Sequence, residues 1–101
     1  MYEMRTVIDV GGILHYSRES TLRKSSVISN ILDRWNNSKT DDEYPFIDRD
    51  GIMFYHILNF LRSGTVVGSD DKHFLTMLSL EAAYFKVKPM ETQIVTLLNE
   101  I

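Results

Sequence analysis

Three histidines are the first candidates for chemistry, because imidazole is both a common metal ligand and a common general base. His15, His56 and His73 show no ligand-like spacing among themselves or with nearby carboxylates, whereas a zinc site usually shows closely spaced ligand pairs. The chain also has no cysteine, which excludes thiolate nucleophiles and Cys-ligated metals. We therefore expect no metal and no cofactor, with His15 and His56 as hydrogen-bonded core or interface residues.

The segment Asp48-Arg49-Asp50-Gly51 superficially resembles a calcium loop. If Gly51 takes the place of the invariant loop glycine, Phe46 falls at the first ligand position and Ile57 where a bidentate Glu belongs. That pattern cannot bind calcium. It indicates a turn followed by a helix, with Asp50 as the N-cap.

Nucleophilic catalysis has no better support in the sequence. The chain contains no Gly-x-Ser-x-Gly elbow, and it has no cysteine to pair with a histidine. Gly11-Gly12 lacks the following Lys or the further glycines of a phosphate-binding loop. The acidic pairs Asp41-Asp42 and Asp70-Asp71 lie in expected loops, where solvation explains them. We expect no enzymatic activity.

A cluster of charged and polar side chains remains, and it lies in the 15-residue stretch 48–62, which is otherwise apolar. Its members are Asp48, Arg49, Asp50, His56, Asn59 and Arg62. Solvation at the surface accounts for each of them alone, and a cation at the end of a helix also favours the helix dipole. Their concentration alternatively indicates polar pairing across a subunit boundary, since the planar guanidinium suits interface carboxylates.

The elements that position this cluster can be predicted from local patterns. Residues 5–10 and 13–17 are strand-like and flank Gly-Gly, which predicts a β-hairpin. A short apolar strand is expected at 44–47, at a sheet edge or starting near its proline. Residues 65–67 are a further candidate for a short extended piece.

Helices account for the rest of the chain. A short helical turn at 20–22 precedes a helix with apolar positions from 27 to 35. Residues 52–62 are apolar around most of the circumference, so this helix should be central and largely buried. Further helices are expected near 71–86 and after Pro89. Three or four strands followed by helices predict a mixed α/β domain.

Composition limits the class of protein. The chain has 101 residues with 11 Lys and Arg against 14 Asp and Glu, so it lacks the basic stripe of a nucleic-acid-binding protein. Its longest apolar run, Ile52 to Tyr55, is far shorter than a membrane span. We expect one cytoplasmic domain, residues 1–101, without membrane contact. A core this small favours self-association as added stabilisation.

The sequence also resembles a known family. The motifs that carry the resemblance are Val7-Ile8-Asp9-Val10-Gly11-Gly12, Ser20-Thr21-Leu22, Phe46-Ile47-Asp48-Arg49-Asp50-Gly51, Phe54, Ile57-Leu58-Asn59-Phe60-Leu61-Arg62-Ser63-Gly64 and Leu80-Glu81-Ala82-Ala83-Tyr84-Phe85. Their order and spacing are similar to those of the BTB/POZ domain of the potassium-channel tetramerisation type, from about residue 5 to about residue 95.

The resemblance implies an α/β (α+β) BTB/POZ fold, with a small three-stranded sheet and an N-terminal β-hairpin covered by about five helices. It further implies closed homo-oligomeric rings of four or five subunits. Family members include soluble KCTD-type proteins, several of which recruit cullin 3 to a ubiquitin ligase. The subunit contacts of the family point to Asp48, Arg49 and Asp50 here, and also to Asn59 and Arg62.

Two functions consistent with this resemblance remain open. The first is a scaffold or substrate adaptor for cullin 3, with residues 36–43 and 65–73 as the candidate cullin-binding surfaces. The second is the cytoplasmic assembly domain of a voltage-gated potassium channel. Some channel subtypes join their subunits through zinc with His and Cys ligands, so a chain without cysteine is expected to assemble without zinc. Asp9 and His15 depart from the family pattern, which predicts altered packing of the first hairpin.

Overall fold

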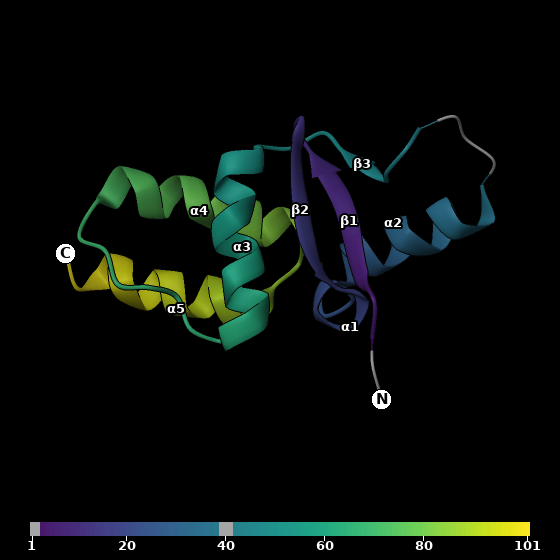
Figure 1. Ribbon diagram of the computed structural model, residues 1–101. Helices are drawn as coiled ribbons and strands as arrows, with labels where there is room; N and C mark the ends of the chain where they lie inside the picture. Colours follow the sequence, from purple (N-terminus) through teal and green to yellow (C-terminus); the bar gives the residue numbers. More distant parts are fainter. Residues whose placement is uncertain (1–2, 39–41) are drawn as a thin grey trace.

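The computed structural model describes residues 3–38 and 42–101. These residues form one three-stranded mixed sheet and five helices, which confirms the α+β BTB-type fold expected from the sequence. Figure 1 shows their arrangement. The elements are β1 (Arg5–Val10), β2 (Ile13–Arg18), α1 (Glu19–Leu22), α2 (Ser26–Asn37), β3 (Phe46–Ile47), α3 (Gly51–Ser63), α4 (Lys72–Tyr84) and α5 (Lys88–Asn99).

The sheet has the strand order β2-β1-β3. The hairpin of β1 and β2 is antiparallel, and it turns at Gly11 and Gly12, whose φ angles of 59° and 95° suit a primed turn. The carboxylate of Asp9 accepts a hydrogen bond from the Gly12 amide at 2.8 Å, which braces this turn. Strand β3 pairs in parallel with the end of β1 and comprises only Phe46–Ile47 of the predicted 44–47. The hairpin and the edge position of β3 are therefore as predicted.

Helices α2, α3 and α4 each begin at a side-chain N-cap. The Ser25 hydroxyl caps α2 by accepting from the Ile28 amide at 3.2 Å, and Asp71 caps α4 by accepting from the Phe74 amide at 3.0 Å. The predicted extended piece at 65–67 pairs with no strand. Its Val66 amide donates instead to the Gln93 side chain at 2.8 Å. Residues 3–38 and 42–101 therefore contain three strands.

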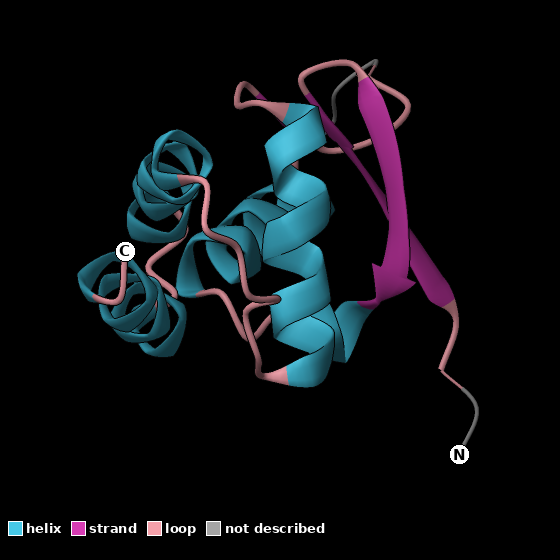
Figure 2. Cartoon of the chain, turned by 90° about the vertical axis from the view of Figure 1, so that its left-hand side faces the viewer, coloured by secondary structure: helices cyan, strands magenta, loops and turns pink. Residues whose placement is uncertain are grey.

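The core lies between the sheet and the helices, which all lie on one side of it (Figure 2). The inward residues of β1, Ile8 and Val10, are fully buried against this layer. Among the helices, α3 supplies the largest share of the remaining core, with Met53, Phe54, Ile57, Leu58, Phe60 and Leu61. The expectation of a central α3 is thus correct. Burial is less complete than predicted, because Ile52 and Tyr55 of α3 are 70% and 57% exposed.

Glycine is required at one packing contact between the sheet and α3. Gly51 opens α3 beside the end of β1, and a Cβ there would collide with the Val10 carbonyl oxygen. This close approach sets the position of the α3 N-terminus against the hairpin. Within residues 3–38 and 42–101, the structure has no helix with the length and apolar character needed to cross a lipid bilayer.

Candidate self-association surface

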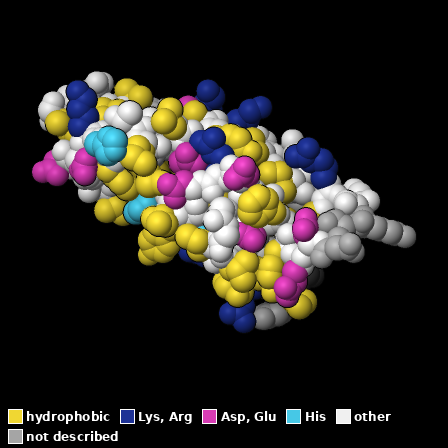
Figure 3. Space-filling model, turned by 90° about the horizontal axis from the view of Figure 1, so that it is seen from above, with side chains coloured by type: hydrophobic (Ala, Val, Ile, Leu, Met, Phe, Trp, Pro, Cys, Tyr) yellow, Lys and Arg dark blue, Asp and Glu magenta, His cyan; other side chains and the backbone are white. Residues whose placement is uncertain are grey.

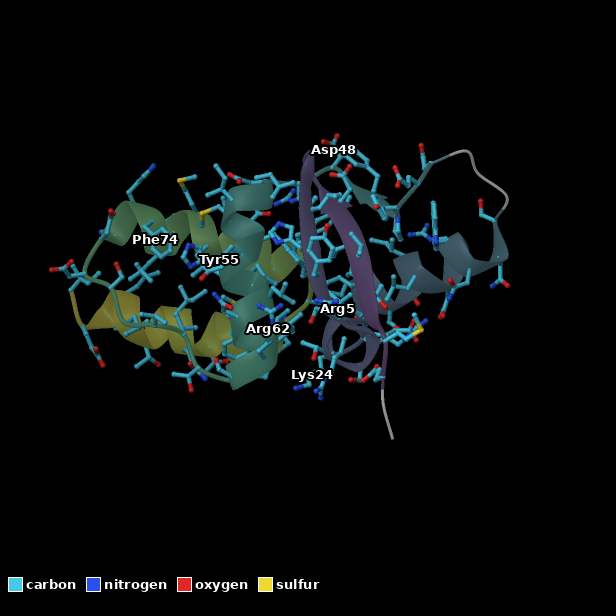
Figure 4. All side chains as sticks on the ribbon, viewed as in Figure 1. Arg5, Lys24, Asp48, Tyr55, Arg62 and Phe74 are labelled. Atoms are coloured by element: carbon cyan, nitrogen blue, oxygen red, sulfur yellow. The ribbon has the colours of Figure 1, made fainter. Side chains whose placement is uncertain are left out.

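The Asp48-Arg49-Asp50 segment links β3 to α3 and lies at the upper end of α3, where Figure 4 labels Asp48. Asp48 is exposed. The carboxylate of Asp50 accepts hydrogen bonds from the amides of Ile52 and Met53 at 2.9 and 3.1 Å, so it caps α3 as predicted. Within this segment, the Asp48 carboxylate is therefore exposed to solvent and does not cap a helix, unlike that of Asp50.

Arg49 forms a bidentate ion pair within its own chain. Its Nε and Nη2 atoms donate to the two carboxylate oxygens of Glu81 on α4 at 3.1 and 2.7 Å. Its guanidinium also lies over the Tyr84 ring, 4.3 Å from the centroid. The hydrogen bonds to Glu81 raise the pKa of Arg49, and the nearby Glu81 charge adds to this effect. Arg49 therefore braces α4 against the start of α3.

Glu81 and Tyr84 were not among the residues predicted for the site. The signal for Glu81 was present, because an acid within the apolar stripe of 74–85 needs a partner when it is buried. In the structure, Glu81 is 9% exposed. No local pattern in the sequence indicates that the partner of Glu81 is Arg49, which lies 32 residues away along the chain.

Asn59 and Arg62 lie near the opposite end of α3 from Asp48. The Arg62 guanidinium donates to the Tyr16 carbonyl oxygen of β2 at 2.7 Å and to the Asn59 side-chain oxygen at 3.3 Å. A helix rises about 1.5 Å per residue, so the 12 steps from Asp50 to Arg62 separate these groups by about 18 Å. The predicted polar cluster is thus divided into two groups near the two ends of α3, with His56 between them.

One face of the sheet is left open by the five helices (Figure 2). Strand alternation and register place Val7 of β1 opposite Tyr16 of β2, and Asp9 between Leu14 and Phe46. Tyr16 and Phe46 are both 52% exposed, and Leu14 is 39% exposed. Several large apolar or aromatic side chains that are exposed together on one face are typical of an interaction surface.

The two ends of this open face carry opposite charges. At the end near the hairpin turn, a hollow of about 420 Å³ is lined by the acids Asp9, Asp42 and Glu43 together with Leu14, Tyr44 and Phe46. At the other end, a hollow of about 360 Å³ is lined by the cations Arg5, Arg18 and Arg62 together with Tyr16, Ser17 and Thr21. The face is therefore polarised along its strands, with an apolar middle.

A strip of exposed apolar side chains on α3 and α4 lies beside the acidic end. Seen from above, this end of the molecule combines hydrophobic side chains with charges of both signs (Figure 3). The strip joins the Arg49 and Asp50 region because Ile52 follows the cap and Tyr84 lies under Arg49. Its members are Ile52, Tyr55, Met77, Leu80 and Tyr84.

His15 and His56 pack against aromatic side chains of the same chain. His15 is 9% exposed; its Nε2 lies 3.0 Å from the Gly51 carbonyl oxygen and its ring packs edge-on to Phe54. Burial lowers its pKa, and the hydrogen bond to Gly51 only partly opposes this. The half-buried His56 packs against Phe74. No group of three or more His, Cys, Asp or Glu within residues 3–38 and 42–101 is placed to hold a metal.

Comparison with known proteins agrees with this geometry. The family model described as BTB/POZ domain, of the potassium channel tetramerisation type, matches residues 6–95. The match includes the hairpin, all of α3 and α4, and most of α5. Because the matched range covers nearly all 101 residues, the chain belongs to the BTB/POZ domain family of the potassium channel tetramerisation type.

Proposed function

We propose that this chain assembles into a closed homo-oligomeric ring of four or five subunits that serves as a scaffold or substrate adaptor for a cullin 3 ubiquitin ligase. BTB domains are protein-interaction domains that generally self-associate. The observation that carries the ring proposal is the open sheet face, which is acidic at one end and basic at the other. The same ring would also serve a channel as its assembly domain.

The separation of charge favours a head-to-tail contact. When the acidic end of one copy meets the basic hollow of the next, each interface joins two different surfaces. Such heterologous contacts form rings when the rotation between copies closes. The apolar strip on α3 and α4 would be buried in the same contact, because it borders the acidic end. Charge complementarity would set the register and burial of the strip would add affinity.

The predicted interface residues contribute unequally to this contact. Asp48 is exposed at the acidic end, and Arg62 is exposed at the basic end. We therefore expect Asp48 of one subunit to lie near Arg62 and Asn59 of the next. Arg49 and Asp50 support this contact indirectly, because their side chains hold α4 and cap α3 within the same chain.

Native mass spectrometry tests the ring directly. The chain at micromolar concentration is expected to give a single tetrameric or pentameric mass. Asp48→Lys should shift this distribution to smaller species, because it places a cation opposite the basic hollow. Asp70→Lys changes the charge equally on an exposed residue of the 65–71 segment, so it should leave the mass unchanged. A wild-type chain that is monomeric under these conditions would refute the ring.

The adaptor part of the proposal has a separate test. Its candidate surfaces are residues 36–43, of which 39–41 fall outside the described residues, and residues 65–73, where Val67 is 81% exposed. Immobilised ring should retain purified cullin 3, and Val67→Asp should reduce the retention without changing the ring mass. Absence of retention by the wild-type ring would remove the adaptor role and leave the ring itself intact.

A further inference from the structure

A third concave surface lies at the lower end of α3, between the C-terminus of this helix, the α1–α2 connection and the α4–α5 connection. We call it the α3-end groove. It has a volume of about 380 Å³. Its lining residues are Lys24, Phe60, Leu61, Arg62, Ser63, Gly64, Lys86, Val87 and Pro89. In Figure 4, Lys24 and Arg62 are labelled at this end of the molecule, far from Asp48.

The groove combines an apolar floor with a cationic rim. Phe60, Leu61 and Val87 contribute the floor, and each remains only 4–6% exposed. Lys24, Arg62 and Lys86 supply the charge, and the lining includes no acid. An apolar floor inside a ring of one charge sign is complementary to a segment with a hydrophobic side chain between groups of the opposite sign.

These cations are positioned without being neutralised by carboxylates. The Lys24 ammonium donates to the Leu61 carbonyl oxygen at 2.9 Å, and the Arg62 guanidinium donates to the Tyr16 carbonyl oxygen at 2.7 Å. Backbone carbonyls hold the two side chains in place and leave their positive charge for a ligand. The Lys86 side chain makes no hydrogen bond or ion pair with the described part of the chain. Three uncompensated cations on a chain of net charge −3 form a local site for anions.

The backbone at Lys86 is a second, independent observation. Its φ of 56° makes it the one non-glycine residue with positive φ in the described chain. It follows the end of α4 in a Schellman arrangement: the Val87 amide donates to the Ala82 carbonyl oxygen at 2.9 Å, and the Lys86 amide to that of Ala83 at 3.1 Å. Glycine is the favoured residue at this position, so a lysine carries a conformational cost. A strained residue that adds charge to a concave surface is evidence for a function of its side chain.

We propose that the α3-end groove binds an acidic peptide segment of a partner protein. One apolar side chain of this segment lies on the floor, and flanking carboxylates contact Lys24 and Lys86; Arg62, at the edge of the groove, also lines the basic hollow and is left to the ring contact proposed above. A nucleic acid would need an extended basic stripe, and a membrane would need a flatter and wider basic surface. The concave shape and the apolar floor favour the peptide. The proposal does not depend on the ring, because the groove is formed within one chain.

Fluorescence anisotropy with a defined probe tests this site. The probe is a short labelled peptide of glutamates around a central leucine. Its controls replace the leucine with serine, or all glutamates with lysines. Wild-type protein should bind the leucine probe several-fold more tightly than the serine control and should not bind the lysine control. Binding should weaken as salt concentration rises, because the charges at the groove rim are accessible to counter-ions.

Lys86→Gly separates binding from folding. This variant removes the cation and relieves the positive φ, so its melting temperature should equal or exceed that of the wild type. Its affinity for the probe should fall about five- to tenfold, as expected for one charge-assisted contact. Lys72→Gln removes a cation at the start of α4 and should bind as the wild type does. Equal probe affinity in wild type and Lys86→Gly would overturn the proposal. A lower oligomeric mass in Lys86→Gly would also overturn it, because a second copy would then occupy the groove.

Discussion

The ion pair between Arg49 and Glu81 gives the sharpest test of how the candidate surface is built. Arg49→Met removes the guanidinium and keeps an aliphatic side chain of similar length. Two hydrogen bonds, of 3.1 and 2.7 Å, are lost, and the Glu81 carboxylate stays between α3 and α4 without its cation. We expect a clear loss of stability, because a buried charge without a partner is strongly disfavoured.

The expected magnitude follows from the burial of the two side chains. Breaking a fully buried pair costs about 3–5 kcal/mol, whereas an exposed pair contributes about 0–1 kcal/mol. The side chains of Arg49 and Glu81 are 31% and 12% exposed, which places this pair between the two limits. We therefore expect Arg49→Met to lower the free energy of unfolding by about 2 kcal/mol. For a domain of this size, the melting temperature would fall by about 8–16 °C.

A double-mutant cycle isolates this interaction. Arg49→Met, Glu81→Leu and the double variant are melted by circular dichroism at one protomer concentration, because self-association changes apparent stability. The coupling energy should be about 1–2 kcal/mol. Asp70→Asn, which removes a charge from an exposed residue outside the proposed ring contact, should leave the melting temperature nearly unchanged.

One pattern of results would refute the reasoning. If Arg49→Met melts at the wild-type temperature, shows no coupling with Glu81→Leu and yet loses its oligomeric mass in light scattering, then Arg49 contacts a neighbouring subunit. The intrachain pair would in that case be incidental. Loss of both stability and oligomer would instead agree with a residue that braces the surface from within.

Two further predictions concern the junction of the hairpin with α3. Gly51→Ala should lower the melting temperature by several degrees or more, because its Cβ would collide with the Val10 carbonyl oxygen; an unchanged thermal melt would show that this junction yields easily. The buried His15 has a lowered pKa. The unfolded chain therefore binds a proton below about pH 6.5 while the folded chain still resists it, so the free energy of unfolding should fall as pH drops from about 6.5 toward the lower folded pKa. His15→Gln should make that part of the pH profile flatter in urea titrations, and parallel profiles would contradict the assignment.

Much of the local architecture could be predicted from neighbouring residues. Gly11-Gly12 between two strand-like runs indicated the hairpin, and Asp50 before an apolar run indicated the cap of α3. These features depend on hydrogen bonds that span two to four residues, so the order of residue types contains the needed information. The family motifs are equally local, and the family match confirmed the family that they indicated.

The arrangement of the site residues could be predicted only in part from such local patterns. The sequence placed Asp48 and Arg62 in one polar cluster, but the length of α3 separates them. It pointed to a partner for Arg49 across a subunit boundary, whereas the structure has Glu81 of the same chain in contact with it.

Local patterns in the sequence specify most of the elements, the side-chain caps of α2, α3 and α4, and the apolar faces. The pairing of each cation with a carboxylate, the burial of His15 and the position of the charges at the two ends of the open sheet face arise from packing in three dimensions. The difference lies in the distance along the chain over which each kind of interaction acts. Capping and periodicity act within a few residues along the chain, whereas an ion pair between positions 49 and 81 forms only after packing has oriented two helices.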